Sequence, residues 1–219
     1  MTMHTSIPVG LILDFDGTMI QEDVGNAICD QFAPPSWRDI NDEYLRGELS
    51  IYEAQRRMWA LVRASQSQIE RFISSLARRD GLQRFMDRTA HSNIPLVIAS
   101  GGFDWYIHRM LGPALTCVQR VYANQLVFQS DGSIRPSFPH LSTLGCHRCA
   151  VCKALVLQVV KQELGPEVQI IFVGDGASDE CVATHADRVF TVRGSRFETF
   201  CAERGISHTP FDSFDEIAV

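Results

Sequence analysis

The feature that most constrains this chain is a short apolar run, Val9 to Leu13, that ends in the acidic sequence Asp14-Phe15-Asp16-Gly17. The run is too short for a typical helix and a glycine follows it, which favours a β-strand. Its apolar residues do not alternate with polar ones, a pattern typical of a parallel strand covered on both faces. Ligands of open parallel sheets bind beyond the carboxyl ends of the strands, so Asp14 and Asp16 are expected in an active site.

Two further apolar runs end in residues suited to ligand binding. Leu96 to Ala99 precedes Ser100-Gly101-Gly102, and Gln169 to Val173 precedes Gly174-Asp175-Gly176-Ala177-Ser178-Asp179. A hydroxyl and free amides after the first run would suit a phosphate. Neighbouring parallel strands would bring Asp14, Asp16, Asp175 and Asp179 into one cleft, where four carboxylates require a cation. Oxygen ligands without paired histidines favour Mg²⁺ over zinc.

The segment between the first two runs is helical in pattern. Ser50 to Glu53 and Ser67 to Glu70 have the form of capping boxes, each followed by apolar residues on one helical face. A block this long exceeds the single helix that a βαβ crossover needs. We therefore expect an α/β fold in which a Rossmann-like parallel sheet core, residues 1–19 and 89–219, carries an inserted helical cap, residues 20–88.

The remaining elements follow from local signals. Val121 to Ile134 predicts a β-hairpin with its turn at 130–133, and Arg188 to Val192 predicts another strand. A helix is expected from Lys153 to Leu164, where Gly165-Pro166 stops it. A lysine in the first turn opposes the helix dipole, so Lys153 is a candidate functional residue.

Charge and cysteine content limit the class of protein. A net charge of -6, from 26 acidic and 20 basic side chains, argues against nucleic acid or an anionic membrane as partner, although an anionic substrate fits. The chain starts without a basic, apolar leader and has no run near the ~20 residues of a membrane span, so a soluble cytoplasmic protein is expected.

Seven cysteines, an odd number, favour reduced thiols. Cys146, Cys149 and Cys152, with His140 and His147 nearby, leave open a small zinc site or a metal-free loop.

Four motifs in order resemble those of the haloacid dehalogenase (HAD) phosphohydrolase superfamily. They are Asp14-Phe15-Asp16-Gly17-Thr18, Ser100-Gly101-Gly102, Lys153, and Gly174-Asp175-Gly176-Ala177-Ser178-Asp179. A cap between the first two motifs is similar to the phosphoserine-phosphatase-like branch. The resemblance implies a Mg²⁺-dependent phosphoric monoester hydrolase, with Asp14 as nucleophile of an aspartyl-phosphate intermediate and Asp16 as general acid and base.

The resemblance also implies the ligands of the metal and the phosphate. Asp14, the main-chain carbonyl of Asp16 and Asp175 would hold Mg²⁺, with Asp179 orienting them. The phosphate would be bound by the residues Thr18, Ser100, Gly101 and Lys153.

A narrower resemblance concerns the substrate, expected to be a small phosphomonoester. Residues 23–35 and the cysteine-rich loop before Lys153 are similar to the methionine-salvage phosphatases that act on 2-hydroxy-3-keto-5-methylthiopentenyl-1-phosphate. Phosphoserine, phosphocholine and phosphoethanolamine phosphatases are alternatives. Phosphoserine phosphatases hold the amino acid with a cap acid and a cap arginine. The matching positions are Asp23 and Met58, and Arg56 and Arg57 lie near enough on the helix to replace the arginine. A catalytically silent phosphate-ligand sensor is an alternative of a different class.

Overall fold

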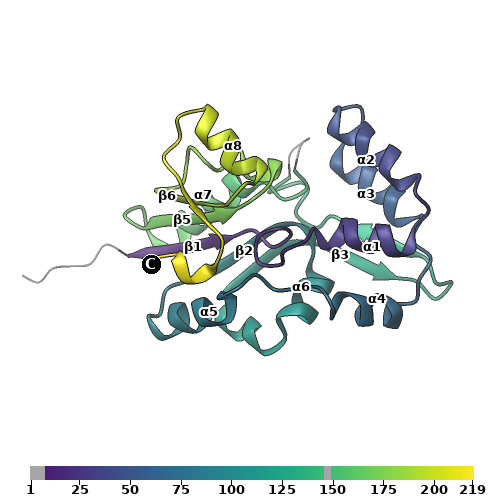
Figure 1. Cartoon of the computed structure of the whole chain (residues 1–219), viewed down its shortest axis with the longest axis horizontal. Coiled ribbons are helices and arrows are strands. Elements are labelled where there is room, and N and C mark those ends of the chain that lie inside the picture. The colour runs from purple at the N-terminus through teal and green to yellow at the C-terminus, as the bar shows by residue number, and fades with distance from the viewer. Residues whose placement is uncertain (1–7, 146–148) are drawn as a thin grey trace, which may run out of the picture.

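A seven-stranded sheet forms the centre of the molecule, which a computed structural model describes for residues 8–145 and 149–219 (Figure 1). The strand order is β4-β3-β2-β1-β5-β6-β7, and neighbouring strands are parallel except for β3 and β4. The strands are β1 (Val9–Leu13), β2 (Leu96–Phe103), β3 (Arg120–Phe128), β4 (Ile134–Ser137), β5 (Gln169–Gly174), β6 (Arg188–Val192) and β7 (Thr209–Phe211). The expected α/β class with a mostly parallel sheet is confirmed.

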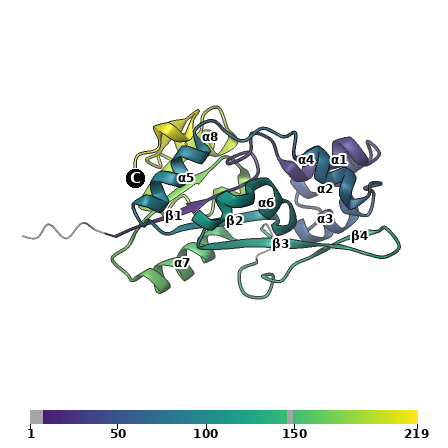
Figure 2. The same ribbon diagram turned by 90° about the horizontal axis from the view of Figure 1, so that it is seen from below.

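Helices cover both faces of the sheet, which explains why β1 is apolar without alternation. Leu11 and Leu13 pack on the face covered by α5 (Leu82–His91) and α6 (Asp104–Leu111). Ile12 packs on the opposite face, under α7 (Lys153–Leu164) and α8 (Arg196–Glu203). Figures 1 and 2 show the two layers of helices on either side of the strands. Short 3₁₀ turns are η1 (Gly112–Cys117), η2 (Ala177–Asp179) and η3 (Phe214–Glu216). In the part of the chain that the structure describes, no helix has the length and apolarity to cross a membrane.

Four helices form a group at the β3–β4 end of the sheet, at the right of Figure 1, with α3 (Ile51–Trp59) against β4. They are α1 (Val24–Phe32), α2 (Trp37–Leu45), α3 (Ile51–Trp59) and α4 (Gln66–Ile73). The two chain segments that lead to this group and back lie side by side, because Ile20 and Arg78 form an isolated antiparallel bridge. The Trp59 ring of α3 packs edge-on against Phe103 of β2, with centroids 5.1 Å apart, so the group shares its apolar core with the sheet.

Helix α5 belongs with the sheet rather than with these four helices. Its Phe85 ring packs on Phe214 of η3 at a centroid distance of 5.2 Å, and Arg84 pairs with Asp215. The division into a core and a cap of residues 20–88 stays a prediction, but these contacts attach most of α5 to the core.

Two local expectations need correction. The capping box of α4 is formed by Ser65 and Gln68, not by the expected Ser67 and Glu70, because the helix begins at Gln66. The residues Ser100 to Gly102 lie within β2, where the pairing with β3 becomes irregular between Ala99 and Phe103, rather than in a loop after the strand. The predicted hairpin, formed by β3 and β4, and the start of α7 at Lys153 are confirmed.

Candidate active site

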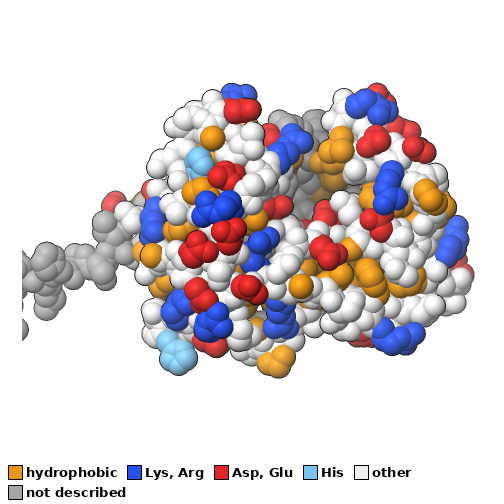
Figure 3. Space-filling view, viewed as in Figure 1, with side chains coloured by type: hydrophobic (Ala, Val, Ile, Leu, Met, Phe, Trp, Pro, Cys, Tyr) orange, Lys and Arg blue, Asp and Glu red, His pale blue; other side chains and the backbone are white. Residues whose placement is uncertain are grey.

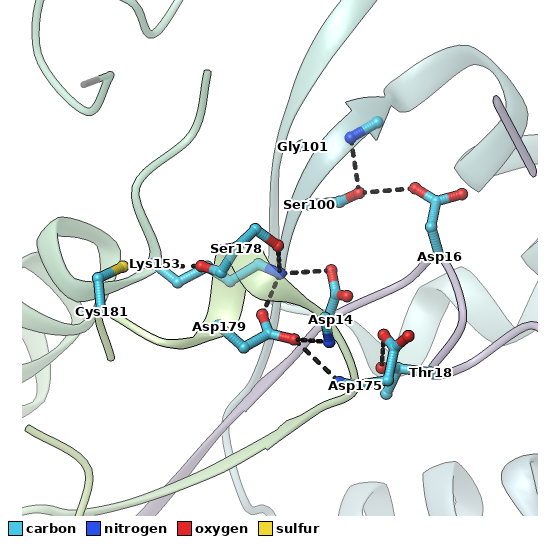
Figure 4. A network of polar contacts seen from close by, with 12 residues as sticks. Asp14, Asp16, Thr18, Ser100, Gly101, Lys153, Asp175, Ser178, Asp179 and Cys181 are labelled. Carbon is cyan, nitrogen blue, oxygen red and sulfur yellow. Dashed lines mark hydrogen bonds and ion pairs between the residues drawn. The ribbon is translucent and has the colours of Figure 1, made fainter. Parts of the chain in front are cut away.

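The motif residues meet at the carboxyl ends of β1, β2 and β5. Strand β1 pairs with both of the others, so Asp14 and Asp175, which follow β1 and β5, lie beside Ser100 of β2, as Figure 4 shows. They adjoin a cavity of about 450 Å³ that is lined by Asp14, Asp16, Gly101 and Asp175 from the sheet side and by residues of α1, α2 and α3 from the other. Figure 3 shows the surface indented between the part that carries α8 and the part that carries α2 and α3.

Lys153 joins two of the motif aspartates behind the cavity. Its Nζ lies 2.8 Å from Asp14 Oδ1 and donates to Ser178 Oγ at 2.8 Å, and it also pairs with Asp179 Oδ1. The lysine is fully buried, and burial by itself would lower its pKa. The carboxylates of Asp14 and Asp179 outweigh this effect and raise the pKa of Lys153, so the ammonium stays charged.

The loop after β5 is fixed by Asp179. Its Oδ2 accepts hydrogen bonds from the amides of Asp175 at 2.9 Å and Gly176 at 2.8 Å. Asp175 in turn accepts from the hydroxyl of Thr18 at 2.9 Å. Gly17 allows this approach, because it has a φ of +74° and a Cβ there would collide with the Asp175 carboxylate.

Three carboxylates form a candidate metal centre. One oxygen from each of Asp14, Asp175 and Asp179 lies within 4.8 Å of the others. Burial raises the pKa of Asp14, an effect that Lys153 opposes and the neighbouring carboxylates increase. Burial, then repulsion from Asp179, raises the pKa of Asp175 to about 6. A cluster with one lysine and this much negative charge fits a cation with oxygen ligands.

Asp16 lies apart from this cluster and has its own donors. Its Oδ2 accepts from the Tyr106 hydroxyl at 2.9 Å and the Ser100 hydroxyl at 3.1 Å, and its Oδ1 accepts from the Val24 amide at 3.1 Å. Burial, then repulsion from Asp23, raises its pKa to about 7 despite these hydrogen bonds. The carboxyl can therefore change protonation state near neutral pH, as a general acid and base must. Gly102 is needed beside it, because a Cβ there would collide with the Tyr106 hydroxyl.

The predicted phosphate and substrate residues are only partly open to the cavity. Gly101 and Asp23 line it, and Asp23 also caps α1 by accepting from the Asn26 amide at 2.8 Å. The hydroxyls of Thr18 and Ser100 already donate to Asp175 and Asp16, so neither has a proton for a phosphate oxygen. Arg56 is exposed, is not among the lining residues and lies over the Phe138 ring, 5.6 Å from its centroid.

Sequence reasoning missed Tyr106, Arg79 and Gln55. The Arg79 guanidinium lines the cavity but donates to the carbonyls of Thr18 at 2.8 Å and Gly17 at 2.6 Å. Tyr106 could have been suspected, because one helical turn after Ser100-Gly101-Gly102 is close enough to contact that motif. No sequence signal indicated Gln55, which depends on how α3 packs over the sheet.

Cys152 lies close to a cysteine outside the loop whose spacing suggested a zinc site. Cys146 and His147 lie outside the described residues. The Sγ of Cys152 lies 3.8 Å from that of Cys181, a residue beyond the cysteine-rich loop. The His140 ring packs against Tyr122. Within residues 8–145 and 149–219, the group of His, Cys, Asp and Glu side chains that could hold a metal is the aspartate cluster. The described residues therefore do not support a zinc site at the cysteines.

Comparison with known proteins agrees with this geometry. A family model described as haloacid dehalogenase-like hydrolase matches residues 11–184. The chain therefore belongs to the haloacid dehalogenase-like hydrolases. Among relatives of this HAD-like hydrolase, a 2-hydroxy-3-keto-5-methylthiopentenyl-1-phosphate phosphatase of Geobacillus thermodenitrificans is 34% identical over 94% of this chain and 92% of its own. A protein of the same name from an Exiguobacterium species is 31% identical over 95% and 94%.

Solved structures show the same fold. A substrate-bound phosphoserine phosphatase superposes on the HAD-like hydrolase with a TM-score of 0.74, at 18% identity over 97% of this chain and 98% of the other. A phosphoserine phosphatase solved as an analogue of the phospho-aspartyl intermediate gives 0.69, at 19% identity over 96% and 97%. The expected family, its phosphoserine-phosphatase-like fold and the enzyme class, a HAD-type phosphatase, are confirmed.

Proposed function

We propose that this HAD-type phosphatase hydrolyses a small phosphomonoester through an aspartyl-phosphate formed on Asp14. The observation that carries the proposal is the pair of carboxylates at the end of β1. Asp14 is paired with a buried lysine at 2.8 Å, whereas Asp16, two residues later, accepts from neutral hydroxyl and amide donors. Burial raises the pKa of both carboxyls, that of Asp16 to about 7. Two carboxyl groups with such different surroundings suit a nucleophile and a proton donor.

In the first step, a carboxylate oxygen of Asp14 attacks phosphorus and the bond to the ester oxygen breaks. The leaving oxygen takes its proton from Asp16, which becomes a carboxylate. In the second step, Asp16 takes a proton from water, the hydroxide displaces Asp14 from phosphorus, and inorganic phosphate leaves. The amide of Gly101 is the group we assign to the phosphoryl oxygens, since the hydroxyls of Thr18 and Ser100 already donate elsewhere. The buried Lys153 ammonium already contacts Asp14, Ser178 and Asp179, so we assign it to holding the charge of Asp14.

Mg²⁺ is the cation we propose for the aspartate cluster. Asp14, Asp175 and the main-chain carbonyl of Asp16 would hold it. Asp179 would orient the Asp175 loop, because both of its oxygens already accept from Lys153 and two amides. When bound, Mg²⁺ neutralises charge on the phosphoryl oxygens.

The substrate we propose is 2-hydroxy-3-keto-5-methylthiopentenyl-1-phosphate, the compound named for relatives that match over more than nine tenths of this chain. The cap side of the cavity supports it, since Ala54, Met58 and Trp59 provide apolar surface for a methylthio group. Phosphoserine is disfavoured because Arg79 is occupied by main-chain carbonyls and Arg56 is outside the cavity lining. Phosphocholine and phosphoethanolamine stay alternative substrates, which the assay below compares with the methylthiopentenyl compound.

Phosphate release from this panel with Mg²⁺ tests the proposal. We expect the methylthiopentenyl compound to give the highest kcat/KM and Asp14→Asn to reduce release from every ester by at least about 1,000-fold, the scale of losing a covalent nucleophile. Folded, metal-loaded protein that releases phosphate from no ester would favour the sensor alternative.

A burst experiment separates the two steps. Asp16→Asn with p-nitrophenyl phosphate should release one nitrophenol per enzyme rapidly and then stall, because this leaving group needs no proton but the second step needs a base. Asp14→Asn should give no burst. A burst in Asp14→Asn, or steady fast turnover in Asp16→Asn, would contradict the assigned roles.

A further inference from the structure

Arg79 places a positive charge in the wall of a cavity whose other charged lining residues are acidic. Among the residues that the structure describes, it is the single lysine or arginine of the lining, whereas the carboxylates there are Asp14, Asp16, Asp23 and Asp175. Arg79 is half-buried, and a charged group removed from water needs polar partners. The identity of these partners indicates what the residue does in the site.

The guanidinium of Arg79 binds the turn that follows β1. Its Nε donates to the Thr18 carbonyl at 2.8 Å, and its Nη2 donates to the Gly17 carbonyl at 2.6 Å. Because a guanidinium is planar and rigid, its two donors keep a fixed spacing, and the bonds therefore fix two successive peptide groups relative to each other. The Phe211 ring packs on the guanidinium, whose central carbon lies 5.9 Å from the ring centroid.

The same turn carries atoms assigned to the metal centre. Thr18 donates its hydroxyl to Asp175 at 2.9 Å, and a Cβ on Gly17 would collide with the same carboxylate. The Asp16 carbonyl, a proposed ligand of Mg²⁺, belongs to the peptide group directly before the two that Arg79 holds. A rotation of the turn would therefore displace the Asp16 carbonyl and release Asp175 from Thr18 at the same time.

The main chain fixes the place from which the Arg79 side chain reaches this turn. The Arg79 amide donates to the Met19 carbonyl at 2.9 Å, one residue from the antiparallel bridge between Ile20 and Arg78. The chain segments that lead to the cap helices and back are thus paired where the side chain begins. Arg79 thereby links the base of the cap to the turn beside the metal centre.

We infer that Arg79 is a positioning residue that holds the turn of Gly17 and Thr18 in the conformation required for cation binding by the aspartate cluster. The inference rests on the proposed function, which assigns Mg²⁺ to Asp14, Asp175 and the Asp16 carbonyl. Arg79 acts through main-chain carbonyls, whereas its charge acts in the opposite direction. The Asp175 carboxylate is close enough to interact with the guanidinium, so the positive charge weakens the attraction of this carboxylate for a cation.

Titration calorimetry with Mg²⁺ and without substrate tests the inference. Arg79→Met removes both donors and keeps most of the apolar stem. We expect its dissociation constant for Mg²⁺ to rise about 10- to 100-fold over that of the wild type, the range for losing a group that orients metal ligands. A charge effect alone would lower the constant, so the direction of the change separates the two roles. Arg79→Lys retains the charge but not the two-donor geometry, so it should also weaken binding, and it decides the test if Arg79→Met does not fold.

Arg78→Met is the matched control. Arg78 is the neighbouring residue, and it donates to the carbonyls of Met110 and Leu111 rather than to the turn. Its replacement should leave the dissociation constant for Mg²⁺ unchanged. Thermal melts with EDTA establish that each variant is folded, and phosphate release from p-nitrophenyl phosphate by the wild type tests the proposed function separately.

Mg²⁺ binding in the folded Arg79 variants that equals or exceeds that of the wild type, or an equal loss in Arg78→Met, would overturn the inference while leaving the phosphatase function in place. A wild type that binds no Mg²⁺ would also overturn it. If that wild type releases no phosphate either, the proposed function fails with it.

Discussion

Asp14 and Asp16 are separated by one residue of chain, yet their side chains have different surroundings. Asp14 is held by Lys153, whose charge favours the carboxylate, whereas Asp16 faces hydroxyl and amide donors but no described cation within ion-pair distance. Burial raises the pKa of both carboxyls. At Asp14 a full positive charge opposes this rise, whereas at Asp16 only the dipoles of neutral donors oppose it. This difference is the physical basis for assigning a nucleophile and a proton donor to neighbouring positions.

The raised pKa of Asp16 predicts a pH dependence that differs between leaving groups. Because Asp16 donates its proton to the leaving oxygen, kcat/KM for an alkyl phosphate should fall as pH rises above about 7, where Asp16 is ionised. The fall should be weaker for p-nitrophenyl phosphate, whose leaving group is stable as an anion. Profiles of the two esters between pH 5 and 9 on the same preparation check this, and superimposable profiles would count against the assignment.

Replacement of Tyr106 by phenylalanine should shift the alkaline limb of this pH profile, the range in which kcat/KM falls as Asp16 ionises. The Tyr106 hydroxyl donates to Asp16 Oδ2 at 2.9 Å and so stabilises the carboxylate. Without it the pKa of Asp16 rises, and the alkaline limb should shift upward by about 0.5 to 1 unit, the equivalent of one hydrogen bond of about 1 kcal/mol. The phenyl ring keeps the packing on Phe15 and Phe103. A downward shift of the limb would show that the hydroxyl does not act on Asp16 in this way.

At the level of elements, the cap helices depend on their caps because each is short. Ser65 accepts from the Gln68 amide and Gln68 Oε1 accepts from the Ser65 amide at 2.8 Å, which satisfies two donors at the start of α4. Ser65→Ala should reduce the free energy of unfolding by about 1 kcal/mol.

The expected change in melting temperature is a decrease of about 2–4 °C for a chain of this size. Ser67→Ala is the control, because Ser67 lies inside the helix and makes no capping bond to the main chain. A larger loss in Ser67→Ala than in Ser65→Ala would return the capping role to the residue that the sequence pattern suggested.

The contacts of α5 lead us to propose a revised boundary for the cap. The bridge between Ile20 and Arg78 closes the cap at the point where both segments leave the sheet. Residues beyond Arg79 contact the core, as Arg84 does through Asp215. We therefore place the cap at residues 20–79, shorter than the predicted 20–88.

For the whole molecule, the aspartate cluster links stability to pH and metal. A carboxyl group whose pKa is higher in the folded than in the unfolded state stabilises the fold at low pH, and this contribution is lost as pH rises through the folded value. Burial raises the pKa of Asp175 to about 6 and that of Asp16 to about 7. Without metal, the wild type should thus lose stability between about pH 4 and 6 relative to Asp175→Asn, which lacks this charge while keeping Asp16.

Mg²⁺ should reverse this loss. At pH 8 and a Mg²⁺ concentration of 100 times its dissociation constant, binding to the folded state alone adds about 2.7 kcal/mol to the free energy of unfolding. This corresponds to an increase in melting temperature of about 5–10 °C. The increase should be small in Asp175→Asn. Calorimetric melts with EDTA and with Mg²⁺ check this without any substrate, and equal increases in the two proteins would place the metal elsewhere.

The chain pattern was enough to predict the strands that carry the motifs, because a buried parallel strand is a continuous apolar run whatever surrounds it. It also predicted the order of motifs and the convergence of Asp14, Asp175 and Asp179, since parallel neighbours end at one edge of the sheet. Asp16 was expected in the same cluster, but its side chain turns to Tyr106, Ser100 and the Val24 amide instead. The predicted start of α4 and the predicted end of β2 were wrong by a few residues, because helix starts and strand ends depend on single hydrogen bonds.

What only the tertiary structure decided is the role of groups that meet across large distances in the chain. Thr18 donates to Asp175 and Ser100 to Asp16, which removes two expected phosphate donors. Tyr106 reaches Asp16 from α6, and Gln55 reaches Gly101 from α3. Local sequence patterns reflect the environment of one segment, whereas these contacts depend on how the cap helices pack over the sheet. The sequence by itself determined which residues gather at the sheet edge, because they follow or end neighbouring parallel strands, and tertiary packing decided which of their atoms remain free to bind a ligand.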